Sequence, residues 1–138
     1  MLNLGIETIT ELLCLPLGTI LILLLQGGLG NGDFGLIFGN PGGGKSWTLI
    51  ALGGYAVSMG FNVIHYTLEL GEDYVGRRYD AYFTQIPVNR IMETQHRPQV
   101  EQAVSNLPGQ LIIKEYSPGK ASMSTIESHI KKMHRPRI

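Results

Sequence analysis

Residues 39–46 read Gly39-Asn40-Pro41-Gly42-Gly43-Gly44-Lys45-Ser46 and match the pattern G-x-x-x-x-G-K-[ST] at every fixed position. This pattern is typical of a loop that binds nucleotide phosphates. Its glycines let the backbone curl tightly, so that successive N–H groups can meet phosphate oxygens in one concavity. We expect Lys45 to reach the β- and γ-phosphates and the Ser46 hydroxyl to bind Mg²⁺. The sequence predicts a site for a magnesium–nucleoside triphosphate, made by Gly39, Asn40, Pro41, Gly42, Gly43, Gly44, Lys45, Ser46 and Trp47.

The segments on either side of this loop support the prediction, because a phosphate loop joins a strand to a helix. Residues 34–38 (FGLIF) form a short apolar run that is typical of a buried strand. Residues 47–59 place apolar side chains at helical spacing, and Gly60 stands where a C-terminal cap is expected. We expect Trp47 to pack between this helix and the sheet, with stacking on the nucleotide as the alternative.

Further along the chain, strand-like and helix-like segments alternate. Residues 62–68 (NVIHYTL) and 111–116 (LIIKEY) are rich in β-branched and aromatic residues and predict two more strands. The predicted element order is β-α-β-α-(α)-β-α, which implies right-handed crossovers and a mostly parallel sheet covered on both faces. The predicted fold class is therefore α/β, with three layers in the order α/β/α.

Three helices are expected after the second strand. The first opens with Gly71 and an acidic turn and ends before Pro87, and a short helix follows over residues 99–107. On the first of these helices, Arg77 and Arg78 are expected to make surface ion pairs, with contact to a neighbouring subunit as the alternative. The last helix is predicted to begin with a capping box and to bury one face; the box is Ser124 and Glu127, and the face is Met123, Ile126, Ile130 and Met133.

Glu69 directly follows the second predicted strand, as Gly39 follows the first. The carboxyl ends of parallel strands meet at one edge of a sheet, which is where ligands bind in such folds. Hydrolysis of a γ-phosphate needs charge neutralisation and a group that orients the attacking water. We therefore predict Lys45 and Glu69 as catalytic residues, for these two tasks respectively. The alternative is that Glu69 is a solvated residue at a turn.

Composition narrows the class of protein. The chain has 138 residues, 43% of them hydrophobic, which is enough for one domain with an ordinary core. Its 11 Lys and Arg balance 11 Asp and Glu, so no overall positive field favours nucleic acid. Cys14 is the only cysteine, which excludes an internal disulfide and favours an intracellular setting. The apolar residues 12–25 fall short of the roughly 20 needed to span a membrane, and the histidines lack the spacing of a zinc site.

Three parts of the sequence together resemble a known family: residues 27–33 (GGLGNGD), the loop with Lys45 and Ser46, and residues 66–69 (YTLE). They resemble RecA-like ATPases, and most of all the ATPase domain of DnaB-like replicative DNA helicases of the phage type, with KaiC and RadA as related branches. The likeness covers residues 27–133, so residues 1–26 are taken as an apolar lead-in and residues 27–138 as a partial ATP-binding domain.

The resemblance implies ATP and Mg²⁺ as cofactors, with Glu69 in the position of the catalytic glutamate. It also implies a homo-oligomeric, hexameric ring in the full-length protein. Single-stranded or forked DNA would bind through regions mostly outside this chain. The expected location is the cytoplasm of a bacterium or a phage-infected cell, with no membrane partner.

This chain departs from the family pattern after the last predicted helix. The Walker B strand with its metal-binding Asp, the DNA-contacting loops and the arginine finger would follow Ile138, so the sheet is expected to be incomplete at its C-terminal end. The missing strands would lie between residues 34–38 and the strand that ends at Glu69. Residues 19–25 (TILILLL) could fill that gap as a strand, with a helix as the alternative. Four functions stay open: a helicase motor, a KaiC- or RadA-like ATPase, a small-molecule or nucleotide kinase, and a nucleotide-binding remnant without turnover.

Overall fold

The computed structural model describes residues 32–133. The predictions for residues 1–26, including a strand over residues 19–25, lie outside the described part of the chain. The element order is α3 (Lys45–Ser58), β1 (Val63–Thr67), α4 (Glu72–Thr84), the 3₁₀ turn η1 (Thr94–His96), α5 (Arg97–Ser105), β2 (Leu111–Glu115) and α6 (Met123–Met133). None of the helices in this part of the chain is long and apolar enough to cross a membrane.

The sheet in the described region consists of β1 and β2, which pair in parallel. The register runs from Val63 opposite Leu111 to Thr67 opposite Glu115. Parallel neighbours need a long crossover, and α4, η1 and α5 supply it. The predicted strands over residues 62–68 and 111–116 are thus confirmed to within a residue or so at each end, as is the mixed α/β class with parallel strands.

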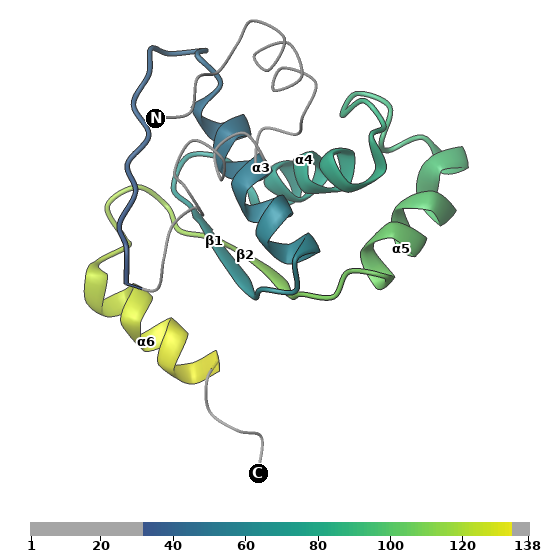
Figure 1. The fold of residues 1–138 in the computed structure, drawn as a ribbon. Coiled ribbons are helices and arrows are strands. Elements are labelled where there is room, and N and C mark those ends of the chain that lie inside the picture. The colour runs from purple at the N-terminus through teal and green to yellow at the C-terminus, as the bar shows by residue number, and fades with distance from the viewer. Residues whose placement is uncertain (1–31, 134–138) are drawn as a thin grey trace, which may run out of the picture.

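The strand expected over residues 34–38 was wrong: in this structure the segment has no strand pairing. Phe34 and Phe38 are 87% and 84% exposed, where a buried strand had been predicted. A strand is stable only when a neighbouring backbone takes up its N–H and C=O groups. Neither β1 nor β2, the two strands within residues 32–133, lies beside this segment to do so. Figure 1 shows it running apart from both strands before it enters α3.

Helix α3 begins at Lys45 and ends with the cap that the sequence predicted. Gly60 has φ 90°, a left-handed conformation that favours glycine. The Gly60 N–H donates to Val57 O at 3.0 Å, and the Phe61 N–H donates to Ala56 O at 3.0 Å. These two bonds form a Schellman motif, which satisfies carbonyls that a helix end leaves unpaired.

The core lies where α3 and α4 pack on one face of the two strands (Figure 1). Ile50, Val75 and Tyr79 are its buried centre. Two glycines of α3 permit the close approach of α4: a Cβ at Gly53 would overlap the Tyr79 hydroxyl, and one at Gly54 would overlap the Tyr82 ring. Val75 and Tyr79, four residues apart on α4, are thus buried at the contact with α3.

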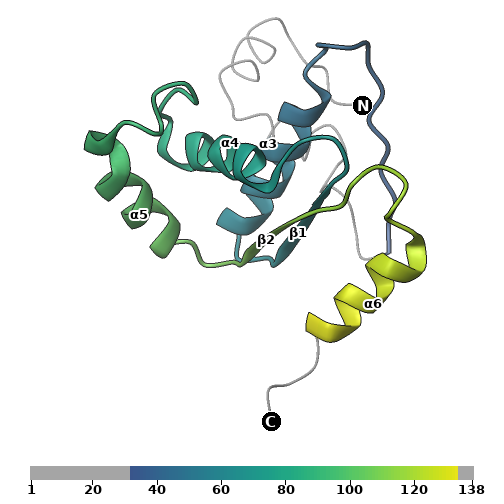
Figure 2. The same ribbon diagram turned by 180° about the vertical axis from the view of Figure 1, so that it is seen from behind.

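Helix α6 stands apart from α3, α4 and α5 (Figure 2). It touches the sheet through the His129 Nδ1 atom, which lies 2.8 Å from the Tyr66 hydroxyl. Tyr66 follows His65 on β1, and His65 faces Tyr79 of α4, so successive side chains place α6 and α4 on opposite faces. Each face of the sheet thus meets a helix.

Three details of the predicted helices needed correction. None of the α6 residues is buried and Met123 is 81% exposed, so the expected buried face of α6 is absent. The cap of α6 is Ser122 instead of Ser124, because the Ser122 hydroxyl accepts the Thr125 N–H at 3.2 Å. Helix α5 begins before the predicted residue 99, with a proline in its first turn, where no N–H is needed.

Candidate phosphate-binding site

The loop before α3 is shaped by short-range bonds. The Gly43 N–H donates to Asn40 O at 2.9 Å, and Gly42 between them has φ 76°. With Pro41 as its second residue, this turn has the sequence and the positive third φ of type II. A Cβ at Gly43 would lie 2.9 Å from Asn40 O, a separation that real Cβ atoms do not show. Position 43 therefore requires glycine because there is no room for a Cβ. Position 42 requires it because the backbone has a positive φ.

The loop leads directly into the N-terminus of α3. Gly44, the N-cap, has φ 83° and no side chain to satisfy the first N–H groups of the helix. Those groups lack intrahelical partners in any α-helix, and the helix dipole adds partial positive charge at the same end. This arrangement suits an anion such as a phosphate.

Lys45 folds back over the loop. Its Nζ atom donates to the backbone oxygens of Gly39 and Asn40, both at 2.8 Å. A Cβ at Gly39 would lie 3.3 Å from Lys45 Cγ, so glycine at position 39 leaves room for the lysine stem. The cation is thus held at the loop by neutral acceptors, which a phosphate oxygen can replace with a stronger, charge-assisted bond.

Ser46 and Glu69 line one hollow of about 210 Å³ between α3, α4 and the end of β1. Both residues are exposed, and neither side chain makes a hydrogen bond or ion pair with residues 32–133. Residues 39–45 are not among those that line this hollow. The structure therefore brings Ser46 to the same hollow as Glu69, while Lys45 stays on the loop side.

Thr67 sets the turn that carries Glu69, a role that sequence reasoning missed. It is the last residue of β1, and its buried hydroxyl donates to Leu70 O at 2.8 Å. The same hydroxyl oxygen accepts the Leu70 N–H at 3.2 Å. These bonds close the chain around Leu68 and Glu69 and turn it toward α4. The signal was present in the sequence, since Ser and Thr hydroxyls often hold such turns.

Trp47 and Arg78 differ from the expectation. Trp47 is 45% exposed and does not pack between helix and sheet. Its ring lies beneath the guanidinium of Arg78, whose Cζ is 5.0 Å from the ring centroid. Within residues 32–133 neither Arg77 nor Arg78 makes an ion pair, so the predicted surface pairing is absent. Arg78 instead lines the hollow with Ser46 and Glu69, a position that no local pattern in the sequence indicates.

Burial and the charge of Arg78 shift the pKa values of groups around the hollow. Burial lowers the pKa of His65, which lines the hollow and lies 2.9 Å from the Tyr79 hydroxyl through Nδ1. Burial raises the pKa of Tyr79 to about 12, so this hydroxyl keeps its proton at neutral pH. A hydrogen bond from Arg78 lowers the pKa of Tyr74. The hollow thus has a neutral imidazole and a cation in its wall.

Magnesium would find one protein ligand at this site. The Ser46 hydroxyl is unbonded within the described residues, as a metal ligand must be. No group of three or more His, Cys, Asp or Glu side chains in residues 32–133 is placed to hold a metal ion. The Ser or Thr that ends this loop pattern supplies a hydroxyl to Mg²⁺, whose shell is completed largely by substrate phosphates and water. The residues present fit that mode.

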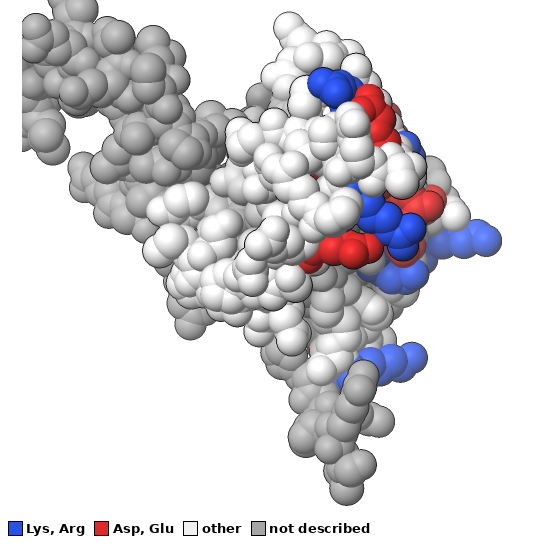
Figure 3. Space-filling model, turned by 90° about the vertical axis from the view of Figure 1, so that its right-hand side faces the viewer, with Lys and Arg blue, Asp and Glu red and all other residues white. Residues whose placement is uncertain are grey.

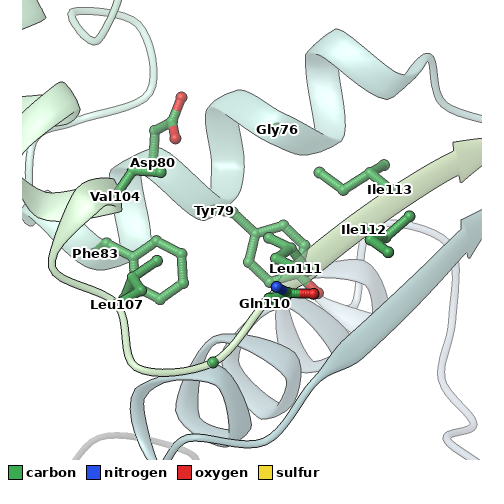
Figure 4. Close-up of a pocket in the computed structure, with 11 residues that line it drawn as sticks. Gly76, Tyr79, Asp80, Phe83, Val104, Leu107, Gln110, Leu111, Ile112 and Ile113 are labelled. Atoms are coloured by element: carbon green, nitrogen blue, oxygen red, sulfur yellow. The ribbon is translucent and has the colours of Figure 1, made fainter. Parts of the chain in front are cut away.

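A larger hollow of about 470 Å³ lies between α4, α5 and β2, away from the loop (Figure 4). Figure 4 shows Tyr79, Phe83, Leu107 and Leu111 gathered around it, with the Asp80 carboxylate pointing away from the rings. Its lining contains neither Lys nor Arg. It is therefore unsuited to phosphate, although it is the larger of the two.

Charged side chains of both signs intermingle on the face shown in Figure 3. The ion pairs within residues 32–133 include Arg90–Glu93 at 3.2 Å and Arg97–Glu101 at 3.0 Å. This face carries no broad area of a single sign, which is what a nucleic-acid backbone would require.

No protein-family model matches this chain, and no curated protein matches it. The geometry of the site therefore carries the functional argument.

Proposed function

We propose that this chain binds Mg-ATP through residues 39–46 and hydrolyses it, as part of a RecA-like P-loop ATPase most similar to the motor of DnaB-like replicative helicases. One observation carries the proposal most directly: Ser46, at the start of α3, and Glu69, after β1, line one hollow next to a loop of phosphate-binding sequence. The supposed metal ligand and the supposed water-orienting carboxylate are thus on a common surface. They are separated in sequence by a whole helix and strand.

Each residue has a defined task under this proposal. The N–H groups at the start of α3 and the Lys45 ammonium hold the β- and γ-phosphates. Ser46 supplies the hydroxyl ligand for Mg²⁺, which when bound neutralises charge on the phosphate oxygens. The Glu69 carboxylate, which has no partner within residues 32–133, accepts a hydrogen bond from the attacking water and orients it.

Binding to single-stranded or forked DNA and assembly into a hexameric ring are further parts of the proposal, and both depend mostly on regions outside this chain. KaiC- or RadA-like ATPases share the motifs on which the proposal stands. Unwinding of a forked duplex by the full-length protein separates a helicase from those two branches.

A second candidate function is nucleotide binding without turnover. The observation that favours it is the unpaired, exposed segment at residues 34–38, which leaves the loop without a strand to anchor its N-terminal side. A loop held from one side can bind phosphate but fixes the reacting atoms less firmly, and small displacements are costly to catalysis.

The test is calorimetric binding of Mg-ATP, followed by measurement of phosphate release. Lys45→Ala is expected to weaken binding by about 10- to 100-fold, because it removes a charge-assisted hydrogen bond. Glu69→Gln is expected to bind normally and to release phosphate about 10²- to 10⁴-fold more slowly. Lys120→Ala and Asp73→Asn are the matched controls, since both residues are exposed and neither lines the hollow.

Three outcomes separate the candidates. No binding of Mg-ATP by the wild-type chain rejects both functions. Binding that Lys45→Ala weakens, without phosphate release, favours the second candidate. Phosphate release that is unchanged in Glu69→Gln removes Glu69 from the mechanism.

A further inference from the structure

Arg78 on α4 lies between two aromatic rings at the edge of the candidate site. Its Cζ atom is 5.0 Å from the Trp47 ring centroid and 4.7 Å from that of Tyr74. Trp47 directly follows Ser46 on α3. Arg78 therefore links α4 to the turn of α3 that carries the supposed magnesium ligand.

The Nε–H group of Arg78 is buried and unsatisfied. It is the only buried side-chain nitrogen or oxygen within residues 32–133 that lacks a hydrogen-bond partner. The faces of the two rings attract the positive charge of the guanidinium, but they give the Nε–H donor no lone pair. A buried donor left unpaired is costly, and natural structures seldom keep one without a reason. Its presence in the wall of the hollow that Ser46 and Glu69 share points to an absent acceptor.

We propose that Arg78 binds the γ-phosphate of the ATP held by the same chain. This inference rests on the proposed function. Guanidinium groups bind phosphate through two parallel N–H···O bonds, a geometry that a lysine lacks. Lys45 approaches the phosphates from the loop side, and Arg78 approaches from the α4 side. To use its Nε–H, the guanidinium moves off the Trp47 ring, so triphosphate binding changes the surroundings of Trp47.

Arg77 provides a matched control on the same helix. Its Cζ atom is 5.6 Å from the Tyr74 ring, so it also has a cation–π contact. However, its Nε–H already donates to Asp73 O at 3.2 Å, and it does not line the hollow. A substitution at Arg77 removes the same charge from the same helix without touching the supposed phosphate position.

The experiment uses the fluorescence of Trp47, the only tryptophan in the chain. The full chain is titrated with Mg-AMPPNP, a non-hydrolysed triphosphate, and separately with Mg-ADP. Wild type is expected to show a larger change in Trp47 emission with the triphosphate than with the diphosphate. Arg78→Met is expected to bind Mg-AMPPNP about 10- to 100-fold more weakly, to lose the extra emission change, and to bind Mg-ADP within about twofold of wild type.

Two further variants keep the test informative. Arg78→Lys retains the charge and the aliphatic stem, and it is expected to recover part of the triphosphate affinity without the full emission change. Arg77→Met is expected to match wild type in both titrations. Circular dichroism checks that each variant is folded. If Arg78→Met does not fold, the result for Arg78→Lys decides the test.

The outcomes distinguish this inference from the proposed function. If wild type binds neither nucleotide, both are rejected. If wild type binds both and Arg78→Met binds them equally well, or loses both affinities equally, the inference about Arg78 is wrong and the proposed function stands. If Arg78→Met retains triphosphate affinity but slows phosphate release, Arg78 acts through Glu69 instead of on the γ-phosphate, which also overturns the inference.

Discussion

Residues 34–38 and β1 have similar sequences, but only β1 forms a strand. Both are short apolar runs that predict a buried strand, and both precede a residue of the candidate site. Val63–Thr67 became a strand because Leu111–Glu115 lies beside it and α3 packs against it. Residues 34–38 have no partner strand within the described part of the chain, and their phenylalanines are exposed. A strand-like sequence therefore forms a strand only where the fold places another strand beside it.

The packed region and the exposed segment should respond very differently when one apolar side chain is truncated in each. Ile50→Ala, in the core where α3 meets α4, is expected to lower the free energy of unfolding by about 2–5 kcal/mol, because it leaves a cavity. Leu36→Ala, in the exposed segment, is expected to change it by less than about 0.5 kcal/mol. Urea denaturation measures both. Equal destabilisation would mean that residues 34–38 are packed in solution, contrary to this structure.

The loop at residues 39–46 offers a second test, in which nucleotide binding is measured instead of stability. Gly43→Ala is expected to lower Mg-ATP affinity by about tenfold or more, because its Cβ would force the turn at Asn40 to open. The thermal midpoint should shift little, since the loop residues are exposed or half-buried. Calorimetry with Mg-ATP gives the affinity, and a parallel melt gives the midpoint. Unchanged affinity would show that this turn geometry is not what binds phosphate.

The C-terminal end of α3 gives a smaller effect that depends on conformation alone. Gly60→Ala is expected to lower the free energy of unfolding by about 1–2 kcal/mol, because alanine is strained at φ 90°. The nearest atom to the new Cβ would be Pro108 Cβ at 4.0 Å, so packing adds no penalty. Ser58→Ala is a nearby exposed comparison. If Gly60→Ala were neutral in urea denaturation, the helix would end differently from the Schellman motif described above.

The smallest expected effect is a pH dependence in the packed region. Burial lowers the pKa of His65 below its ordinary value of 6.5, so between the two values the unfolded chain binds more protons than the folded one. The free energy of unfolding should therefore fall as the pH drops through about 6.5 and level off below the folded pKa. Urea denaturation from pH 5 to 8, with His65→Gln as the comparison, measures this. The reverse slope in the wild-type minus variant difference would mean that His65 is charged in the fold.

The features that could be predicted from the sequence are those that depend on residues close together in the chain. The Gly60 cap, the start of α4 and the turn-forming glycines of the loop follow from bonds between near neighbours, and they could be predicted. The cap of α6 was placed at Ser124 although Ser122 makes the bond, because both serines fit the pattern and only the geometry separates them. The sequence placed Glu69 near the loop because two parallel strands were expected to end at one edge of the sheet. Residues 34–38 are not a strand, so it is the packing of α3, α4 and β1 that brings Ser46 and Glu69 to one hollow.

Features that depend on distant partners could not be predicted. Arg78 has the sequence context of a surface arginine, with acidic residues close by on the helix. It lies over Trp47 because α3 crosses α4 closely at Gly53 and Gly54, and a helical pattern does not specify that crossing. Trp47 is exposed for a related reason, since the ring meets α4 instead of a sheet.

The local sequence specifies the alternation of helices and strands, the conformation of the loop at residues 39–46 and the residue types available to bind phosphate. These depend on backbone preferences of glycine and proline and on hydrogen bonds that span a few residues. Tertiary packing leaves residues 34–38 outside the sheet of the described region and places Glu69 and Ser46 on one hollow. It also puts Arg78 in the wall of that hollow, with a buried Nε–H that lacks a partner within residues 32–133. Each of these depends on contacts between segments far apart in the chain, which local preferences do not encode.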